Sequence, residues 1–325
     1  MEPRLRPAEL VGHHFTKETL ARLQVRGDGL LSEAEVAVLR SMICPLEKAF
    51  AFTDNEISSV DPRMVAPMII FTTAHVPWKL KPLPILRVHY DKLLDLQFIQ
   101  DLRPVNVVTI RNSGVAPILD DYVELFAARA IYSMADLFSG YDQFQLELAP
   151  RELTAMQTPL GLLRLSVVSM GATNSVGHVQ AELSEIFGAF IPRVTLPFID
   201  DLSMRGARYD TRDKSEVSRG VRRFVHDHAL DVAAILRRAI EVGVTFSSKK
   251  SSFGLREIGV VGFVCNEAGR APGPSKIAAI GRMGSCRTVS EVRRFLGAVG
   301  FYRIFIPHYA DVAEPLYSLL RNEAA

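Results

Sequence analysis

Two adjacent carboxylates interrupt an apolar stretch of this chain, Leu196-Pro197-Phe198-Ile199-Asp200-Asp201-Leu202-Ser203-Met204. The run 194–199 predicts a buried strand that stops at the Asp-Asp pair. Adjacent carboxylates repel each other and the interior of a sheet excludes charge, so such a pair in an apolar hairpin costs free energy. A divalent cation would remove that cost. The alternative is an ordinary polar turn, and we interpret Asp120-Asp121, at an expected helix start, as a pair that needs no metal.

A third carboxylate follows an earlier apolar strand. Residues 130–137 have the composition of a strand and carry Asp136 near their end. Gly140-Tyr141 then predicts a tight turn, and residues 143–148 alternate polar with apolar side chains as a half-buried strand does. Magnesium prefers oxygen ligands, so carboxylates from different strands would suffice for a metal site.

The rest of the chain predicts further helices and strands. Capping pairs at Ser32/Glu35 and Thr288/Glu291 predict helix starts. Prolines recur over residues 61–86, which predicts an extended arm without a sheet interior of its own. The other predicted elements are a helix over 17–23, a strand over 162–168, a helix from Thr173 or Asn174 to 190, a helix over 217–239, strands at 244–246 and 259–264, and a helical section from Pro272.

The composition is that of an ordinary globular protein. The chain has 325 residues, of which 48% are hydrophobic and 23% charged, and this disfavours disorder, collagen-like repeats and disulfide scaffolds. Cys44, Cys265 and Cys286 lie far apart, so we expect neither a zinc site nor a disulfide framework, and an intracellular compartment. No signal peptide is visible at the first residues, and no apolar stretch reaches the ~18–20 residues of a membrane helix.

The net charge of +2 is unevenly distributed. Residues 1–204 contain 18 Lys and Arg against 24 Asp and Glu, whereas residues 205–325 contain 20 against 12. A basic stripe in the second part predicts phosphate binding, and the alternative is a solvated helix face. The stripe consists of Arg205, Arg208, Arg212, Arg219, Arg222, Arg223, Arg237, Arg238, Lys249, Lys250 and Arg256.

Five segments occur in one order and together resemble a known family. They are Asp136-Leu-Phe-Ser-Gly-Tyr141, Thr154-Ala-Met-Gln-Thr-Pro-Leu-Gly-Leu162, Ser169-Met-Gly-Ala-Thr-Asn-Ser175, Phe198-Ile-Asp-Asp201 and Gly243-Val-Thr-Phe-Ser-Ser-Lys-Lys250. In this order they resemble the motifs of reverse transcriptases of Gypsy-like long-terminal-repeat retrotransposons. The likeness covers roughly residues 98–320, and five ordered motifs make it far more specific than one Asp-Asp pair.

The resemblance implies an α+β fold and a polymerase reaction. The fold would be a polymerase palm, an antiparallel sheet backed by helices, with truncated fingers and a helical thumb or connection segment. The reaction would be RNA-directed DNA polymerisation, in which a dNTP is joined to the 3′-hydroxyl of a primer on an RNA or DNA template. It would use two Mg²⁺ or Mn²⁺ ions. No membrane partner is expected.

The resemblance also implies roles for single residues. Asp136 and Asp200 would bridge both ions, Asp201 would support them, and the Leu137 carbonyl would join the metal shell of the triphosphate. The substrate-binding residues carried over in this way are Tyr141, Met170, Gly171, Lys249 and Arg103. Tyr141 would lie beneath the incoming sugar, with core packing as the alternative. Lys249 would approach the triphosphate or protonate the leaving pyrophosphate, and without the resemblance it is interpreted as a solvent-exposed lysine.

The chain departs from the family before the palm. Gln97 stands where the family has a phosphate-binding Arg, and the Lys- and Arg-rich fingers hairpin is missing. We expect an N-terminal helical segment over 1–60, an arm with incomplete fingers over 61–97, the palm over 98–268, and the start of a thumb or connection over 269–325, with no RNase H domain.

The missing hairpin keeps a second hypothesis open, a decayed, inactive copy that retains only nucleic-acid binding. An aspartic protease, which also uses two Asp residues, is disfavoured because the chain contains no Asp-Thr/Ser-Gly.

Overall fold

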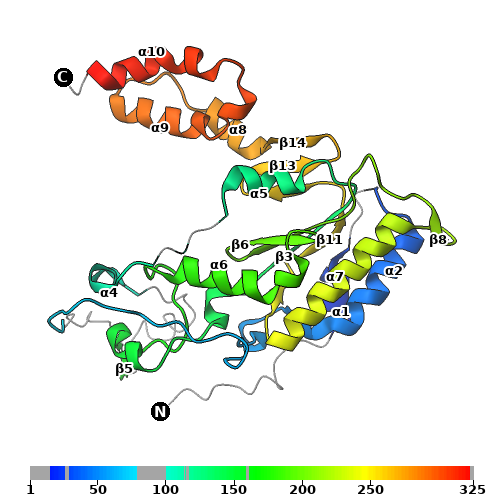
Figure 1. The fold of residues 1–325 in the computed structure, drawn as a ribbon, viewed down its shortest axis with the longest axis horizontal. Helices are drawn as coiled ribbons and strands as arrows, with labels where there is room; N and C mark the ends of the chain where they lie inside the picture. The colour runs from blue at the N-terminus through cyan, green and yellow to red at the C-terminus, as the bar shows by residue number, and fades with distance from the viewer. Residues whose placement is uncertain are drawn as a thin grey trace.

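The computed structural model describes residues 15–25, 29–78, 100–112, 114, 117–158 and 161–322. Gln97 and most of the expected fingers region, residues 79–99, lie outside the described residues. The main body of the molecule is built around one sheet, and a helical thumb projects from it towards the C-terminus (Figure 1).

The central sheet has five strands in the order β1-β11-β3-β7-β6. Their bounds are Gln24–Val25 for β1, Ser252–Leu255 for β11, Tyr132–Asp136 for β3, Asp201–Arg205 for β7 and Thr195–Phe198 for β6. Neighbouring strands from β11 to β6 are antiparallel, and β1 joins the edge in parallel to β11. The expected antiparallel sheet is confirmed, apart from this parallel edge strand.

Helices cover one face of the sheet. They are α6 (Ser175–Ile186), α7 (Arg223–Val242) and α2 (Glu33–Ile43), and α2 lies beside α7 (Figure 1). Side chains alternate along β3 because successive residues of a strand point to opposite faces. Ala135 therefore joins the main core with Leu183 of α6 and Leu236 of α7, and Tyr132 joins a second core on the other face.

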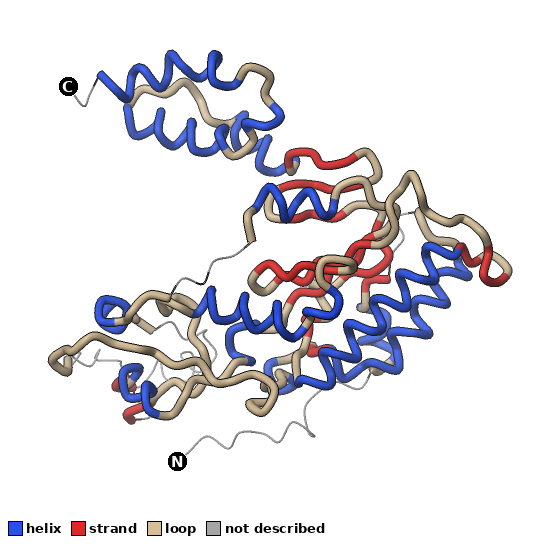
Figure 2. The backbone as a smooth tube through the Cα atoms, in the orientation of Figure 1, coloured by secondary structure: helices blue, strands red, loops and turns tan. Residues whose placement is uncertain are grey.

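The second core is formed with α5 (Leu119–Phe126) and a three-stranded antiparallel sheet. The strands of that sheet are β12 (Ile258–Val260), β13 (Phe263–Asn266) and β14 (Gly269–Pro272). The thumb follows at once, with helices α8 (Pro274–Gly281), α9 (Val289–Gly300) and α10 (Tyr309–Asn322), which Figure 2 shows apart from the main body. Tyr302 links the two, because its hydroxyl donates a 2.7 Å hydrogen bond to the Gly262 carbonyl.

The remaining elements are short. The α-helices are α1 (Lys17–Arg22) and α4 (Arg103–Val108), and the 3-10 helices are Cys44–Ala49, Asp54–Glu56, Gly140–Gln143, Ala149–Thr154, Gly188–Phe190 and Arg303–Phe305. The strands are β2 (Phe50–Ala51), β4 (Met156–Thr158), β5 (Gly161–Leu163), β8 (Glu216–Ser218), β9 (Val221–Arg222) and β10 (Phe246–Ser247). No helix among the described residues is both long and apolar enough to cross a membrane.

Four predicted elements differ from the structure. The strand expected over 162–168 is reduced to β5 (Gly161–Leu163) and an isolated bridge at Val167. The helix expected over 217–239 begins only at Arg223, because Gly220 turns the chain with a φ of +76° and residues 216–222 form the β8–β9 hairpin. The strand expected over 259–264 is two strands, since Val261 and Gly262 both have positive φ. The half-buried strand expected over 143–148 alternates in burial only from Phe144 to Glu147, because Gln143 is buried and Leu148 is exposed, and its residues form only isolated bridges.

Candidate functional site

Strand register brings the three predicted carboxylates to one end of the central sheet. Asp136, the last residue of β3, is paired with Asp201, the first residue of β7. Asp200 lies in the turn between β6 and β7, and its carbonyl accepts a 3.0 Å hydrogen bond from the Leu137 N–H. The two acidic segments are therefore joined through the backbone, so the carboxylates stay together although their charges repel.

The turn that contains Asp200 has a strained backbone and is stabilised by a side chain of a neighbouring helix. Ile199 has a φ of +58°, a conformation that is costly for a β-branched residue. Gln180, on α6, grips both sides of this turn. Its amide accepts a 2.8 Å hydrogen bond from the Ile199 N–H and donates a 3.0 Å hydrogen bond to the Pro197 carbonyl. Gln180 is 5% exposed, so water cannot readily replace these bonds.

A second buried amide holds the turn that follows Asp136. Gln143 donates to the carbonyls of Phe138 and Thr245, at 2.7 and 2.8 Å. It thereby connects this turn to the segment that leads into β10. A Cβ on Gly140, in the same turn, would lie 3.2 Å from the Asp200 Cβ. The close approach of the two acidic segments therefore depends on a residue without a side chain at position 140.

Tyr141 belongs to the main core beside this site. Its side chain is buried, and burial raises the pKa of its hydroxyl, with the negative charge of Asp200 as a second cause. The Tyr141 side chain therefore packs in the core and also lies close enough to Asp200 to be affected by its charge. Its role under an incoming sugar stays a prediction.

Burial and mutual repulsion act on the carboxylates. Burial raises the pKa of Asp201 to about 6, and the negative charges of Asp200 and Asp136 contribute. Burial also raises the pKa of Asp136, although the ammonium of Lys250 acts in the opposite direction. A site that disfavours its own negative charge in this way is one that a cation would stabilise.

The cation beside the carboxylates is Lys250, for which the sequence analysis proposed no role at this site; the predicted role of Lys249 at the triphosphate stays a prediction. Lys250 Nζ lies 2.9 Å from Asp136 Oδ1. Lys249 is exposed, and its backbone carbonyl accepts a hydrogen bond from the Gln24 side chain. The Lys-Lys pair indicated that a cation follows β10, but only the register of the turn decides which lysine faces Asp136.

The oxygen donors have the chemistry that a divalent cation needs. Asp136 Oδ1 is buried and lies 2.9 Å from the ammonium of Lys250. Carboxylate oxygens are the ligands that Mg²⁺ and Mn²⁺ prefer, and this one already has a cation beside it. Within the described parts of the chain, however, no three acidic, His or Cys side chains are already gathered closely enough to hold a metal ion.

The other predicted substrate residues lie on the fingers side. Met170 is 69% exposed, and Gly171, with a φ of +94°, has open space where a Cβ would be. Asn106 fixes their turn, because its side chain donates to the Gly171 carbonyl and accepts from the Thr173 N–H, both at 2.9 Å. The sequence analysis did not identify this contact, which links α4 to the segment 169–175.

Arg103 is already paired in the structure. Its guanidinium contacts the Asp101 carboxylate at 2.7 Å, and this contact holds the pKa of Asp101 at about 2. Both side chains are exposed, 88% for Arg103 and 42% for Asp101. Arg103 can therefore exchange this partner for a phosphate at little cost, since exposed ion pairs are weak. Its substrate role stays a prediction.

The predicted basic stripe is largely neutralised by acidic partners. Arg222 binds the fully buried carboxylate of Glu35 at 2.7 Å. Arg205 is partly buried and donates to backbone carbonyls, including those of Leu125 and Pro192. Ion pairs also engage Arg208, Arg223, Arg238 and Arg256. These contacts favour the solvated-face alternative for most of the stripe.

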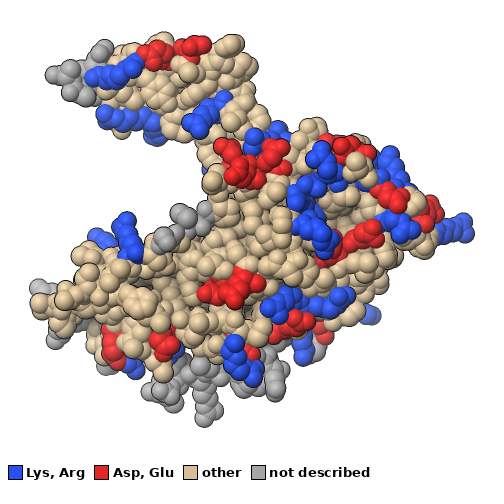
Figure 3. Space-filling view, viewed as in Figure 1, with Lys and Arg blue, Asp and Glu red and all other residues tan. Residues whose placement is uncertain are grey.

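The thumb carries a more strongly basic surface. Residues 273–310 contain six Lys and Arg but only one acidic residue, Glu291. Figure 3 shows Lys and Arg side chains on the side of the thumb that faces the main body across a hollow, with acidic side chains on its outer side. Arg293 and Arg294, on α9, are exposed.

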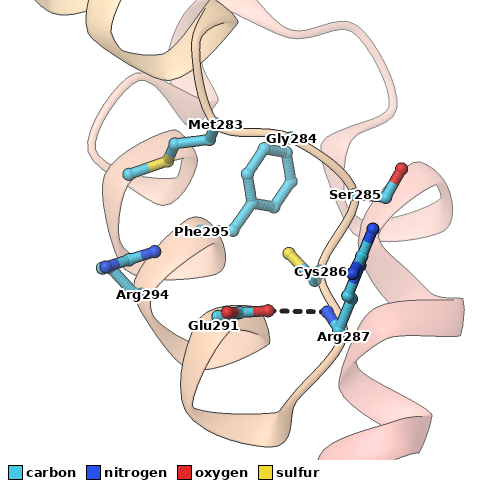
Figure 4. Close-up of a pocket in the computed structure, with 8 residues that line it drawn as sticks. All are labelled: Met283, Gly284, Ser285, Cys286, Arg287, Glu291, Arg294 and Phe295. Atoms are coloured by element: carbon cyan, nitrogen blue, oxygen red, sulfur yellow. Dashed lines mark hydrogen bonds between the residues drawn. The ribbon is translucent and has the colours of Figure 1, made fainter.

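A cavity of about 290 Å³ also lies in the thumb, lined by α9 and by the loop that joins α8 to it (Figure 4). Arg287, Arg294 and Cys286 are among the residues that line it. Glu291 lines it too, but its carboxylate accepts a 2.7 Å hydrogen bond from the Arg287 N–H and caps α9. The cavity is separate from the three carboxylates, so we do not assign it to catalysis.

Comparison with known proteins relates the chain to retrotransposon polyproteins. It is 25% identical over 226 residues to the retrovirus-related Pol polyprotein from transposon opus and 24% identical over 223 residues to that from transposon gypsy, both of Drosophila melanogaster. It is 22% identical over 228 residues to the transposon Tf2-3 polyprotein of Schizosaccharomyces pombe. These matches cover 70%, 69% and 70% of the chain but only 21%, 20% and 16% of the relatives. No protein-family model matches the sequence.

Solved structures share the fold. The foamy viral protease-reverse transcriptase in complex with dsDNA matches with a TM-score of 0.75 at 17% identity, over 96% of this chain and 67% of that one. The same protein in complex with an RNA/DNA hybrid matches with a TM-score of 0.71 at 18% identity, over 94% of this chain and 42% of that one. The expected polymerase fold and the resemblance to Gypsy-type Pol proteins are therefore confirmed.

Proposed function

We propose that this chain, a homologue of Gypsy-type and Tf2 Pol polyproteins, is the polymerase part of a reverse transcriptase. The reaction would join a dNTP to the 3′-hydroxyl of a primer paired with an RNA or DNA template. The observation that carries the proposal is the meeting of Asp136, Asp200 and Asp201 at one end of the sheet. The shared fold and the homologues support the class of protein.

The carboxylates are proposed to hold the metal ions of this reaction. Asp136 and Asp200 would bind both ions with the Leu137 carbonyl nearby, and Asp201 would support them. When bound, Mg²⁺ or Mn²⁺ would supply Lewis-acid activation of the primer hydroxyl and charge neutralisation of the triphosphate. The chain itself contributes position, since the β3–β7 register and the Gln180 amide fix where the carboxylates lie.

Other residues are proposed to position the substrates. Tyr141 would limit the space under the sugar, and the Met170–Gly171 turn would contact the nucleotide and template. Arg103 and the lysine pair Lys249 and Lys250 would attract phosphates. Asn106 would act as a positioning residue, because it holds the Gly171 carbonyl.

The thumb is proposed to bind the primer-template through phosphates. Its residues 273–310, with six Lys and Arg against one acidic residue, provide the positive potential that such binding needs. We assign residues 98–268 to the palm and 269–325 to the thumb or connection, as the sequence predicted, and 61–97 to the arm and fingers.

The test is primer extension on an RNA template by the full chain with Mg²⁺ or Mn²⁺. Extension should be lost in Asp200→Asn, with the fold retained, because a metal ligand is removed and a repulsive charge is neutralised. Asp120→Asn is the matched control, since Asp120 lies in the first turn of α5 and contacts only Arg270 among its described ion pairs. Equal activity of parent and Asp200→Asn would remove Asp200 from the mechanism. Binding of primer-template by a parent that cannot extend it would indicate an inactive binding module.

A further inference from the structure

We propose that Lys250 is a built-in counter-ion that occupies the metal site until a divalent ion displaces it. The proposal deepens the function proposed above and rests on it, because it concerns the same carboxylates. It predicts that Lys250 lowers the metal affinity of the site and stabilises the protein when no metal is bound.

The first argument is the position of the ammonium. Lys250 Nζ lies 2.9 Å from Asp136 Oδ1, and the negative charges of Asp200 and Asp201 also act on it. The ammonium is in direct contact with Asp136, and the other two carboxylates act on it through their charge. Asp136 Oδ1 is buried, so the ammonium at 2.9 Å supplies positive charge to an oxygen that water does not reach.

The second argument is competition for one oxygen. A divalent ion held by Asp136 would need the oxygens that face the ammonium, and two cations at such close range repel each other strongly. Metal binding must then expel the ammonium.

The third argument is that Lys250 is able to leave. Its side chain is 66% exposed, whereas that of Asp136 is 14% exposed. It follows the short strand β10 and precedes β11, so it stands on a turn and not within the sheet. A long, flexible side chain on a turn can move into solvent without disturbing the core.

Lys249 provides a matched control within the same turn. It carries the same charge one residue earlier, and it is exposed, while its backbone carbonyl binds the Gln24 side chain. The variants Lys250→Gln and Lys249→Gln therefore change the net charge equally. A general effect of charge would be the same in both, and only displacement from Asp136 would separate them.

The experiment is Mn²⁺ titration of the full chain without nucleotide or primer, followed by electron paramagnetic resonance of free Mn²⁺. We expect Lys250→Gln to bind Mn²⁺ about fivefold more tightly than the parent, which corresponds to about 1 kcal/mol. Lys249→Gln and the charge-conserving Lys250→Arg should bind like the parent. Equal tightening in Lys250→Gln and Lys249→Gln, or none in either, would overturn the proposal.

Thermal unfolding gives an independent readout. In EDTA, Lys250→Gln should melt at a lower temperature than the parent, because the carboxylates lose their counter-ion. Added Mn²⁺ should raise the melting temperature of Lys250→Gln by more than it raises that of the parent. If Lys250→Gln does not fold in EDTA but folds with Mn²⁺, the counter-ion role is supported. If Lys250→Gln folds under neither condition, the variant Lys250→Arg is the deciding test. Folding and Mn²⁺ affinity of Lys250→Arg like those of the parent would support a requirement for positive charge at this position. Failure of Lys250→Arg to fold would contradict that requirement.

Asp136→Asn separates this proposal from the proposed function. If it leaves Mn²⁺ binding unchanged, the ions are bound elsewhere and the proposed metal site fails together with the inference. If it abolishes binding while Lys250→Gln and Lys249→Gln behave alike, the metal site stands and only the counter-ion role of Lys250 fails.

Discussion

The carboxylates at the end of the central sheet destabilise the fold, although the proposed function requires them. Asp136, Asp200 and Asp201 are held together by strand register and by one backbone hydrogen bond, although burial and repulsion disfavour their charges. The free-energy cost of this arrangement is borne by the fold in the absence of metal. Substitutions at these positions should therefore reveal both roles.

Asp201→Asn should stabilise the protein at neutral pH. The pKa of Asp201 is raised from 3.8 to about 6, so the folded state binds more protons than the unfolded state between these values, and the contribution of Asp201 to stability falls as pH rises through about 6. The gain on substitution should be roughly 1–3 kcal/mol at about pH 8 and should vanish below about pH 4. Denaturant unfolding of variant and parent at several pH values checks this.

The comparison must be the difference between variant and parent. Burial lowers the pKa of His228 from 6.5 to about 4, and this residue destabilises both proteins as pH falls through the same window, because the unfolded state binds the proton. A constant difference between variant and parent across pH 4–8 would contradict the raised pKa of Asp201.

Gln180→Ala should loosen the turn that carries Asp200. The change removes the hydrogen bonds to the Ile199 N–H and the Pro197 carbonyl, which should cost roughly 1–3 kcal/mol of stability. Faster hydrogen exchange at Ile199 and weaker Mn²⁺ binding should accompany the loss. Gln157→Ala, at an exposed position of β4, is the control. Unchanged exchange at Ile199 would show that α6 does not hold the turn.

The sequence could identify the carboxylates but not the side chains that support them. Asp136, Asp200 and Asp201 follow apolar runs in an ordered set of motifs, which is a local signal. Gln180 lies on a helical pattern that gives no sign of its contact with residue 199, since that contact depends on tertiary packing. The choice between Lys249 and Lys250 depends on the backbone of a turn, and periodicity does not extend into turns.

At the scale of helices and strands, the start or end of an element could be predicted where it depends on residues close together in the sequence. The capping boxes at Ser32/Glu35 and Thr288/Glu291 are both formed, at the starts of α2 and α9. Residues 216–222 look helical by apolar spacing, but Glu35 binds the backbone N–H and the guanidinium of Arg222 and thereby stabilises the β8–β9 hairpin. That partner is 187 residues away, so no local pattern could reveal it.

Gly243→Ala should destabilise the end of α7. Gly243 caps this helix with a φ of +78°, and a Cβ there would lie 2.6 Å from the Ser59 carbonyl oxygen. The combined strain should cost roughly 2 kcal/mol or more. Thermal or denaturant unfolding measures it.

Gly297→Ala is the matched control for this substitution. Gly297 lies inside α9, and a Cβ there would meet no atom within 4 Å. This change should therefore stabilise the helix by about 0.5–1 kcal/mol. Equal effects of the two substitutions would mean that neither the positive φ nor the close carbonyl matters at Gly243.

At the scale of the whole molecule, the thumb should dominate binding to nucleic acid. The double variant Arg293→Gln/Arg294→Gln should bind primer-template more weakly, and the slope of log affinity against log salt should fall by about 1–2. Arg208→Gln/Arg256→Gln removes the same charge from two residues of the stripe that already pair with Asp210 and Glu267. It should have little effect. Equal losses in both double variants would return the binding role to the stripe.

The parallel pairing of β1 with β11 also sets a schedule for synthesis of the protein. Ser252 pairs with Gln24, 228 residues earlier in the chain. A ribosome that adds about 5–20 residues per second makes the first of these strands roughly 10–45 s before the second. During that interval β1 has no partner, and α2 likewise waits for α7. The palm can therefore close only late in translation, and nascent chains that stop before β11 should depend on chaperones to avoid aggregation.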